Sequence, residues 1–585
     1  MNSWQMICFF LYFGDIYATI IPNISLFNKK WISDNMIVKN MIYNMEITDT
    51  NNLGFGVGRI KDIVVFVKGA VGGDFAQVRI IKVNKSYCVG RAEKILIPSP
   101  NRCSGNKCPI DSRCGGCAFR GLSYRYELEL KRSFVTNAFI KHGMRHIKVL
   151  DTLSTGKTDR YRNKAQYPVG VSAEGGYDIG FYAARSHRII NSADCALQPK
   201  IFNEIVEFVR IFMTEKKIPA YCEKTHTGLV RHLYFRIGER TGEVMVCLVL
   251  NGTNFPFADE FCTSLTRIFP SVVSIMINEN RERTNVVLGE SFSCIYGKEY
   301  IDDILCDIRL KIPPASFYQV NRDGAELLYR KAAELAAFRG DEVLLDLFCG
   351  IGSIGLSMAK SVKEVIGIEI VPEAVEYANK NAADNGIGNA KFYCGDASNV
   401  AELLALAEQT RGSEISPDVI VVDPPRKGCS PELIDHIAEL SPDRVLYISC
   451  NPGTLARDAE RFEKHGYLCS DVIPVDLFPR TGHVETVVQL VRKKPDTYLD
   501  VKIDMSELDA TPAETTATYQ EIKDYIQEKH GIKVSSLYIA QVKEQLGIKE
   551  RECYNKSKSE HARQPQCPEA KANLITDALA HFQMI

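Results

Sequence analysis

Cys450 lies where an apolar, β-rich run, Arg444–Ser449, stops abruptly at an Asn-Pro turn. In an open α/β sheet that position presents a thiol at the carboxyl edge, where ligand binding and catalysis concentrate. A lone carboxylate, Glu485, follows downstream within the sequence Thr-Gly-His-Val-Glu-Thr. A thiolate, a carboxylate base and a methyl donor are the parts needed to alkylate carbon 5 of a pyrimidine. This stretch is predicted to hold the first two.

The Asp-Pro-Pro-Arg motif at residues 423–426 favours attack on a ring carbon. An aromatic residue after Asp-Pro-Pro would suggest methylation of an exocyclic amine, but Arg426 stands there instead. Carbon 5 of uracil is a poor nucleophile until a thiolate adds to carbon 6. Cys450 is the candidate thiolate, and Glu485 is the candidate base that removes the carbon-5 proton after methyl transfer.

The alternative for Cys450 is a buried strand cysteine without chemistry, which is the common fate of this residue type. Its Asn-Pro exit and the presence of Glu485 favour catalysis. A free thiol has a pKa of about 8.5 and needs an electropositive setting or a nearby base to ionise. Arg480 and His483 are candidates for that role by their proximity in the sequence.

A G-x-G-x-x-G motif at residues 350–355 follows the apolar run 343–348 and opens a helix, while Glu369 ends the next strand. Glycines let the backbone approach a nucleotide cofactor closely, and a carboxylate at the second strand tip accepts the ribose hydroxyls. The spacing alone fits a dinucleotide as well as S-adenosylmethionine (SAM). Further carboxylates, of the kind that methyltransferases place around adenosine and methionine, favour SAM: Asp346, Asp396 and Asp423.

A second chemical cluster, Cys108, Cys114 and Cys117, lies in a Pro-, Gly- and Cys-rich stretch with spacing x5 then x2. Three thiolates need a fourth ligand for a tetrahedral zinc or a four-iron cluster, and Cys103, Cys195 or a more distant cysteine is available. Radical-SAM enzymes use x3 then x2, so this spacing argues against radical chemistry. Zinc and an iron–sulfur cluster both stay open on spacing alone.

The chain of 585 residues is too long for one hydrophobic core, so several domains are expected. Its net charge of −1 hides a basic block, because residues 59–132 hold 15 Lys and Arg against 6 Asp and Glu. Such a block favours a polyanion partner, nucleic acid above all, over a merely solvated basic face. The 19 cysteines are scattered and odd in number, which argues against a disulfide framework and favours a reducing cytoplasm.

The pattern along the chain predicts a multidomain α/β protein with five segments. Residues 1–45 are an extension without an assigned function, since their apolar run lacks the features of a signal peptide or a membrane span. Residues 46–100, short β-rich runs broken by glycines, indicate an OB-like RNA-binding barrel. Residues 101–310 combine the cysteine segment with a central α+β domain. In residues 311–495, helices alternate with strands at 343–348, 364–368, 419–422, 444–449 and 485–490, which indicates a doubly wound parallel sheet.

Residues 496–585 begin with a polar linker and continue with two short helices. The first starts at a capping box of Thr518 and Glu521 and stops at Gly531, and Ser535 caps the second, which runs to about Leu546. The pair resembles a helix-turn-helix that could contact RNA. A packing appendage is the favoured interpretation.

Taken together, these motifs resemble the bacterial 23S rRNA uracil-5-methyltransferase family, in its iron–sulfur members with an N-terminal TRAM domain. The resemblance covers about residues 46–493. Further markers are Asp-Cys-Ala-Leu-Gln at 194–198 and Phe-Tyr-Gln-Val-Asn at 317–321. One departure is Ser353, where some members carry an asparagine that touches the cofactor.

The resemblance implies SAM-dependent methylation of a uridine in 23S rRNA, with Cys450 as nucleophile and Glu485 as base. The implied partner is RNA, with no membrane and no protein partner. For SAM, the implied contacts are Gln319, Phe348, Glu369, Asp396 and Asp423. For a 4Fe–4S cluster, the implied ligands are Cys108, Cys114, Cys117 and Cys195, with Cys103 as a bystander.

Two other functions compete with this one. A tRNA uracil-5-methyltransferase shares the cysteine and glutamate mechanism, although such enzymes usually lack the barrel and the cysteine cluster. An inactive RNA-binding or assembly protein with a relic SAM pocket is the other, and the intact Cys450 and Glu485 count against it.

Overall fold

The computed structural model describes residues 37–493 except positions 104, 106–107, 112, 193 and 412–414, together with residues 517–546, 567–582 and 584. The chain divides into two compact units, Met1–Lys494 and Pro495–Ile585. Most of the expected N-terminal extension and of the linker after residue 493 lies outside the described residues. Within the described part of the chain, no helix has both the length and the apolar character that a membrane crossing requires.

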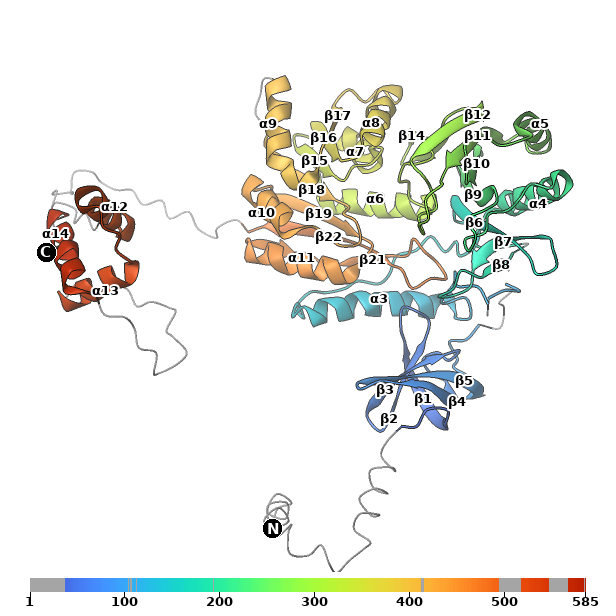
Figure 1. Ribbon diagram of the computed structural model, residues 1–585, viewed down its shortest axis with the longest axis horizontal. Helices are drawn as coiled ribbons and strands as arrows, with labels where there is room; N and C mark the ends of the chain where they lie inside the picture. The colour runs from blue at the N-terminus through green and yellow to red at the C-terminus, as the bar shows by residue number, and fades with distance from the viewer. Residues whose placement is uncertain are drawn as a thin grey trace, which may run out of the picture. The chain divides into compact units, whose positions relative to one another are not determined.

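The N-terminal barrel is closed, as its β-rich runs predict, with strand order β1-β2-β3-β5-β4 (Figure 1). Alternate strand residues face inward, where Val65, Val67, Val78 and Ile80 are fully buried. β1 starts at Ile42, so the barrel takes in residues that the sequence pattern assigned to the extension. The strands are β1 (Ile42–Thr50), β2 (Gly56–Ile60), β3 (Ile63–Lys68), β4 (Phe75–Val83) and β5 (Tyr87–Ile97).

The C-terminal part of the first unit holds a sheet of eight strands, ordered β17-β16-β15-β18-β19-β22-β20, with β21 paired to β22. The first five of these pair in parallel, which confirms the doubly wound fold. The strands are β15 (Val343–Leu347), β16 (Glu364–Glu369), β17 (Ala390–Cys394), β18 (Val419–Val422), β19 (Arg444–Ser449), β20 (Tyr467–Cys469), β21 (Ile473–Val475) and β22 (Glu485–Arg492).

One strand departs from the predicted parallel order. β22 runs antiparallel to β19, although the sequence pattern placed it among the parallel strands. The chain enters β22 from β21 through a loop at residues 476–484, without the crossover that a parallel neighbour needs. The start of β22 therefore lies beside the end of β19, at the carboxyl edge of the sheet.

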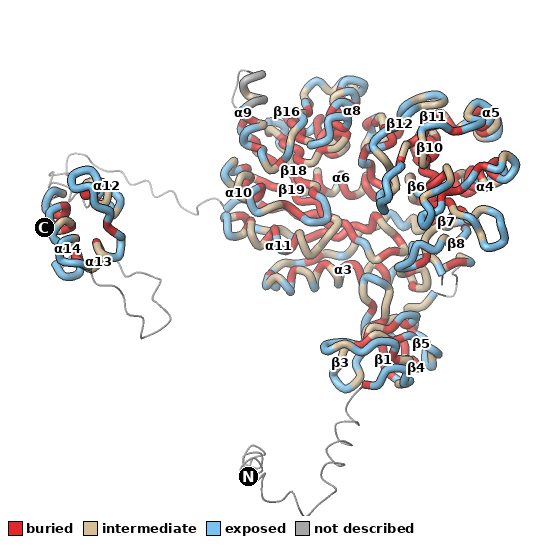
Figure 2. The backbone as a smooth tube through the Cα atoms, in the orientation of Figure 1, coloured by how far each residue is buried: buried red, intermediate tan, exposed pale blue. Residues whose placement is uncertain are grey.

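Helices cover both faces of this sheet, and the buried residues between the layers form two cores (Figures 1 and 2). One core packs under α6, α7 and α8, and the other under α9, α10 and α11. The helices are α6 (Arg322–Ala336), α7 (Ser353–Met358), α8 (Pro372–Asp384), α9 (Val400–Arg411), α10 (Pro431–Leu440) and α11 (Pro452–Lys464).

Helix α3 (Tyr124–Lys141) packs on the eight-stranded sheet, which we call the methyltransferase-like sheet, rather than on the central domain to which the sequence pattern assigned it. Its buried residues Val135 and Phe139 belong to the same core as α11. The chain that follows also pairs with this sheet, because Val149 bridges Val472 of the segment before β21. A helix early in the chain therefore supports the catalytic end of the molecule.

The central domain is a sheet of seven strands, ordered β12-β11-β10-β9-β6-β7-β8. β10 is buried along its whole length, since alternate residues face a core under α4 and α5 or the core shared with α6. Its elements are β6 (Lys164–Val171), β7 (Tyr177–Tyr182), β8 (Ile189–Asn191), α4 (Lys200–Lys216), β9 (Val230–Ile237), β10 (Val244–Leu250), α5 (Ala258–Ile268), β11 (Val272–Glu279) and β12 (Ser291–Gly297), followed by the hairpin β13 (Ile301–Leu305) and β14 (Ile308–Ile312).

A fully buried ionic network joins α3 to the loop that leads into β22. The Lys131 ammonium donates to Glu127 Oε1 at 2.8 Å and to Asp476 Oδ1 at 2.6 Å. Tyr124 donates its hydroxyl to Asp476 Oδ2 at 2.8 Å, and the Arg480 backbone N–H donates to Glu127 Oε1 at 2.6 Å. Because all three charged side chains at its centre are 0% exposed, the network is shielded from water and from salt.

The second unit contains α12 (Tyr519–His530), α13 (Ser536–Gln545) and α14 (Glu569–His581). The predicted capping box is present, since Thr518 and Glu521 bond each other's backbone N–H, and Gly531 ends α12 in the left-handed conformation. The apolar sides of α12 and α13 pack with α14 in one core, through residues such as Ile522 and Ile575. This packing uses the apolar faces of the helices within the unit itself.

We expect Lys131→Met to lower the stability of the first unit by about 3–5 kcal/mol, because Glu127 and Asp476 would be left buried without a cation. The measurement is the apparent free energy from the midpoint of chemical denaturation. Lys148→Met is the matched control: it removes an exposed pair with Asp471 at 3.5 Å, which contributes about 1 kcal/mol or less. Equal midpoints for the two variants would contradict the role of the network.

Candidate active site

The register of two strands brings Cys450 and Glu485 together. β19 and β22 pair Ser449 with Thr486, and the Thr486 hydroxyl donates to the Ser449 carbonyl at 3.0 Å. In an antiparallel ladder the next residues along each strand face one another. Cys450 therefore lies opposite Glu485, and the thiol and the carboxylate predicted from the sequence meet at one edge of the sheet.

The turn that carries Cys450 is held by its neighbour Asn451. The Asn451 side chain accepts from the Gly453 N–H at 3.0 Å, capping α11, and donates to the Arg426 carbonyl at 3.0 Å. Pro452 occupies the first turn of that helix, where its missing N–H costs nothing. The Asn-Pro pair thus begins the helix and ties the thiol to the Asp-Pro-Pro-Arg loop.

Cys450 is half-buried, and its charged neighbours differ from those expected. Burial, followed by the charges of Glu485 and Asp423, raises the pKa of the Cys450 thiol, and Arg426 opposes that rise. Arg480, a candidate by sequence proximity, instead directs its guanidinium to the Leu122 carbonyl at 3.1 Å. Arg426 is therefore the cation that favours the thiolate.

Glu485 is 3% exposed. Burial, together with the charge of Asp423, raises the pKa of Glu485 to about 8, with Arg426 acting in the opposite direction. Burial also raises the pKa of Asp423 to about 7. A carboxylate whose pKa lies near the working pH is suited to act as a general base.

The backbone after β15 adopts the shape that a nucleotide-binding turn requires. Phe348 has φ +67°, a strained value for an aromatic residue and one that accumulates at functional sites. Gly352 has φ +82°, and an added Cβ there would lie 2.9 Å from the Phe392 ring. Glu369 Oε2 accepts from the Gly350 N–H at 3.1 Å, which joins the second strand tip to this turn.

The turn at residues 348–352 and the strand tips beside it form what we call the cradle. Asp346 provides the clearest test of whether the cradle fits SAM. Its Oδ2 accepts from the Gly355 N–H at 2.8 Å, while its buried Oδ1 has no hydrogen-bond partner within the described part of the chain. Burial raises the pKa of Asp346 to about 7, and the charges of Asp423 and Glu369 add to this. An unpaired buried acceptor among three carboxylates fits a ligand that carries positive charge, as SAM does.

Two other predicted cofactor residues lie at the margins of this cradle. Asp396 begins the 3-10 helix η2 (Ala397–Asn399) and accepts from the Ser398 N–H at 2.9 Å, which lowers the pKa of its carboxyl. Gln319 is buried just before the start of α6, and its carbonyl accepts from the Asn163 side chain at 2.8 Å. Asn163, which directly precedes the first strand of the central domain, therefore holds the backbone of Gln319.

The four predicted cluster cysteines, Cys108, Cys114, Cys117 and Cys195, line one cavity of about 140 Å³. Cys103 is exposed and does not line it. Among the residues that the structure describes, no group of three or more Cys, His, Asp or Glu side chains is arranged to hold a single metal ion. The structure gathers the four thiols without forming a compact zinc site.

Several groups around this cavity favour sulfur in its charged form. Burial raises the pKa of the Cys117 thiol to about 11, and the Arg120 guanidinium opposes the rise. The Gly116 N–H donates to Cys114 Sγ at 3.4 Å, and backbone N–H groups from residues 197 and 198 are directed at Cys195. Positive charge and N–H donors are what thiolate ligands or an anionic cluster need.

Sequence reasoning missed the buried network that holds the loop before Glu485. Glu127 and Lys131 are four residues apart on a helix, a spacing that ordinarily indicates an exposed ion pair. Asp476 lies 345 residues after Lys131. No local signal connects them.

Two family models match the chain. The model described as tRNA (uracil-5-)-methyltransferase matches residues 290–493, and the TRAM domain model matches residues 40–92. The first match covers the sheet with Cys450 and Glu485, and the second covers most of the barrel. Both matches agree with the architecture described above.

Relatives match over most of their length. An uncharacterized RNA methyltransferase of Clostridium tetani is 40% identical over 452 residues, 77% of this chain and 96% of that protein. Another, of Halalkalibacterium halodurans, is 40% identical over 456 residues, 78% of this chain and 98% of that protein. The crystal structure of Pyrococcus abyssi tRNA (uracil-54, C5)-methyltransferase with S-adenosyl-L-homocysteine is 28% identical with a TM-score of 0.60, covering 76% of this chain and 100% of that chain. With its site geometry and these matches, the chain belongs to the family of SAM-dependent RNA uracil-5-methyltransferases that carry a TRAM domain.

Proposed function

We propose that this protein methylates carbon 5 of a specific uridine in 23S rRNA through a covalent adduct between Cys450 and carbon 6. The observation that carries the mechanism is the β19–β22 register, which sets the thiol opposite a buried carboxylate. The N-terminal barrel and the cysteine cavity support an rRNA substrate, because tRNA uracil-5-methyltransferases usually lack both, although related two-domain enzymes do act on tRNA.

In the proposed mechanism, the Cys450 thiolate adds to carbon 6 of the flipped uracil, and carbon 5 gains the electron density of an enolate. Bound SAM supplies the methyl group that carbon 5 takes. Glu485 then removes the proton from carbon 5, the carbon 5–carbon 6 double bond re-forms, and the Cys450 sulfur leaves carbon 6. The charge of Arg426 favours the Cys450 thiolate both before it adds to carbon 6 and after it leaves.

The residues proposed to hold SAM lie in and beside the cradle. Phe348, Glu369, Asp396 and Asp423 are proposed to hold SAM, together with Gln319 from the segment before α6. The unpaired Asp346 oxygen adds an acceptor that the resemblance did not supply. The cofactor's positive charge would favour ionisation of the buried carboxylates, which in turn strengthens binding.

The second proposed cofactor is a 4Fe–4S cluster on Cys108, Cys114, Cys117 and Cys195. A four-iron cluster needs four thiolates around one space, and the observation that supports this proposal is that the four cysteines line one cavity. The cluster would organise the segment between the barrel and α3, because Ala118 and Phe119 donate backbone N–H groups to the Arg480 carbonyl.

A tRNA substrate is the second candidate, because the matched family model and the Pyrococcus abyssi structure both carry tRNA in their descriptions. The deciding experiment is mass-spectrometric mapping of 5-methyluridine in 23S rRNA and tRNA from cells with and without this gene. We expect loss of the modification at a 23S rRNA position and its return with the wild-type gene. Loss confined to tRNA would overturn the rRNA proposal, and no loss would overturn the enzymatic one.

Cys450→Ala is expected to reduce methyl transfer on the order of 10³-fold or more, because the nucleophile is gone. Glu485→Gln keeps the shape but cannot accept the proton, so it should transfer methyl once and retain RNA covalently, as a shifted band on a denaturing gel. Cys294→Ala, at another half-buried cysteine far along the chain from the site, is the control and should turn over normally. Normal turnover by Cys450→Ala would sink the mechanism.

Cys117→Ser is expected to lose most of the iron and acid-labile sulfide from protein purified without oxygen, since one of four ligands is removed. Cys103→Ser is the matched control, because Cys103 does not line the cavity, and it should retain both. Metal analysis by mass spectrometry is the measurement. Zinc in place of iron, or equal iron in the two variants, would contradict the cluster.

A further inference from the structure

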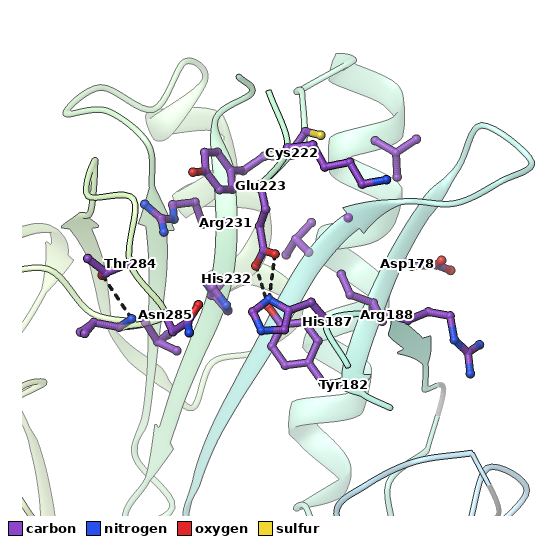
Figure 3. A pocket seen from close by; sticks show the side chains of 18 residues that line it. Asp178, Tyr182, His187, Arg188, Cys222, Glu223, Arg231, His232, Thr284 and Asn285 are labelled. Atoms are coloured by element: carbon purple, nitrogen blue, oxygen red, sulfur yellow. Dashed lines mark hydrogen bonds and ion pairs between the residues drawn. The ribbon is translucent and has the colours of Figure 1, made fainter. Parts of the chain in front are cut away.

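A cavity of about 850 Å³ lies in the central domain and takes no part in the chemistry above (Figure 3). It opens at the carboxyl end of β6, whereas the amino end of that strand follows Asn163, which bonds Gln319 on the cofactor side. Eight residues of strand span about 25 Å. The cavity is therefore separate from the place where Cys450 acts.

One wall of the cavity carries a buried imidazole without a partner. His232, on β9, is 9% exposed, and its Nδ1 makes no hydrogen bond within the described residues. Burial, followed by the charge of Arg231, lowers the pKa of His232 to about 4, so the ring is neutral at physiological pH. A neutral imidazole offers one donor and one acceptor, which suits the hydrogen-bonding edge of a nucleobase.

Aromatic rings also line the cavity, and their partners hold them in place. The rings of Tyr182 and His187 lie 5.3 Å apart at 30°, and His187 Nδ1 is 2.8 Å from Glu223 Oε2. Figure 3 shows these three side chains and His232 gathered at the centre of the view.

A second aromatic group stands across the cavity. The Arg231 guanidinium lies 4.5 Å from the centre of the Tyr221 ring, and its Nη1 donates to the Asn280 and Glu282 carbonyls at 2.6 Å and 2.8 Å. The remaining basic side chains of the lining are Arg188 and Lys224. Aromatic faces beside cations are the combination that binds unstacked bases and their phosphates.

The lining also includes apolar side chains that the fold leaves uncovered. Val171 is 64% exposed and Val286 is 62% exposed, although both are aliphatic, and both line the cavity. The cavity adjoins the cysteine segment as well, since Gly115 donates its N–H to the Tyr182 carbonyl at 3.2 Å. A ligand held here would touch the same hairpin that supports the cluster cysteines.

We propose that this cavity binds an unstacked nucleobase of the substrate RNA, a second contact apart from the uridine that meets Cys450. This inference rests on the proposed RNA methylation, whichever RNA carries the target. The rings of Tyr182, His187 and Tyr221 stack the base, His232 bonds its edge, and Arg188 and Lys224 meet the flanking phosphates. RNA that bends to fill both sites at once would be selected by shape as well as by sequence.

The first test is ultraviolet cross-linking of the full-length wild-type protein to total RNA from cells that lack the gene, with mass-spectrometric identification of the attached peptides. We expect nucleotide adducts on peptides that contain Tyr182–His187 or Tyr221. Adducts confined to the barrel and the methyltransferase-like sheet would overturn the proposal. The result does not depend on turnover, so it stands apart from the outcome of 5-methyluridine mapping.

The second test measures binding of the same RNA by variants. His187→Ala should weaken affinity by about tenfold, the effect of losing one stacking face. His146→Ala is the matched control, because it breaks a pair outside the cavity, with Glu463 at 2.9 Å, whose histidine side chain is 61% exposed against 54% for His187. Arg188→Glu against Arg267→Glu, an exposed arginine on α5, repeats the comparison for charge. Equal affinities within each pair would overturn the proposal.

Discussion

The buried ammonium of Lys131 is the interaction on which the catalytic edge of the molecule depends. Through Glu127 and Asp476 it fixes the loop between β21 and β22, and that loop delivers Glu485 to the site. The same loop accepts backbone hydrogen bonds from the cysteine segment at Arg480. At Gly482 it packs so closely on the barrel that an added Cβ would lie 1.7 Å from the Asn52 carbonyl. The barrel, the cysteine segment and α3 thus all contact the loop that leads to Glu485.

Burial does a second kind of work at the site, through proton affinity. Burial raises the pKa values of Asp346, Asp423 and Glu485 to about 7 to 8, and the charge of Asp423 adds to the rise at Asp346 and Glu485. Without a cation such a group of carboxyls holds protons at neutral pH. A positively charged cofactor favours their ionised forms, so cofactor binding and the readiness of the base are coupled. Within the protein, the charge of Arg426 opposes the rise in pKa at both Cys450 and Glu485.

The distribution of apolar residues explains how the central domain and α3 pack on the eight-stranded sheet. β10 is buried on both faces, so the central domain shares a core with α6, and α3 shares the other core with α11. The central sheet is therefore packed directly against the sheet that carries Cys450. This packing matters for the large cavity beside β9. A base bound there can position the target uridine only if the protein between the two sites is stiff.

Local patterns in the sequence determined the parts whose physics is local. The run Arg444–Ser449, the Asn-Pro turn, the glycine motif at 350–355 and the capping box at Thr518 all lie where predicted, because strand propensity, fixed proline geometry and capping act over a few residues. The direction of β22, the place of α3 and the partner of Lys131 were not predictable in this way. They depend on contacts between segments far apart in the chain, such as Lys131 and Asp476 at a separation of 345 residues, and on burial that turns an ordinary helix ion pair into a structural one. Cys450 and Glu485 could be named from the sequence, but only the antiparallel return of β22 decided that they face each other.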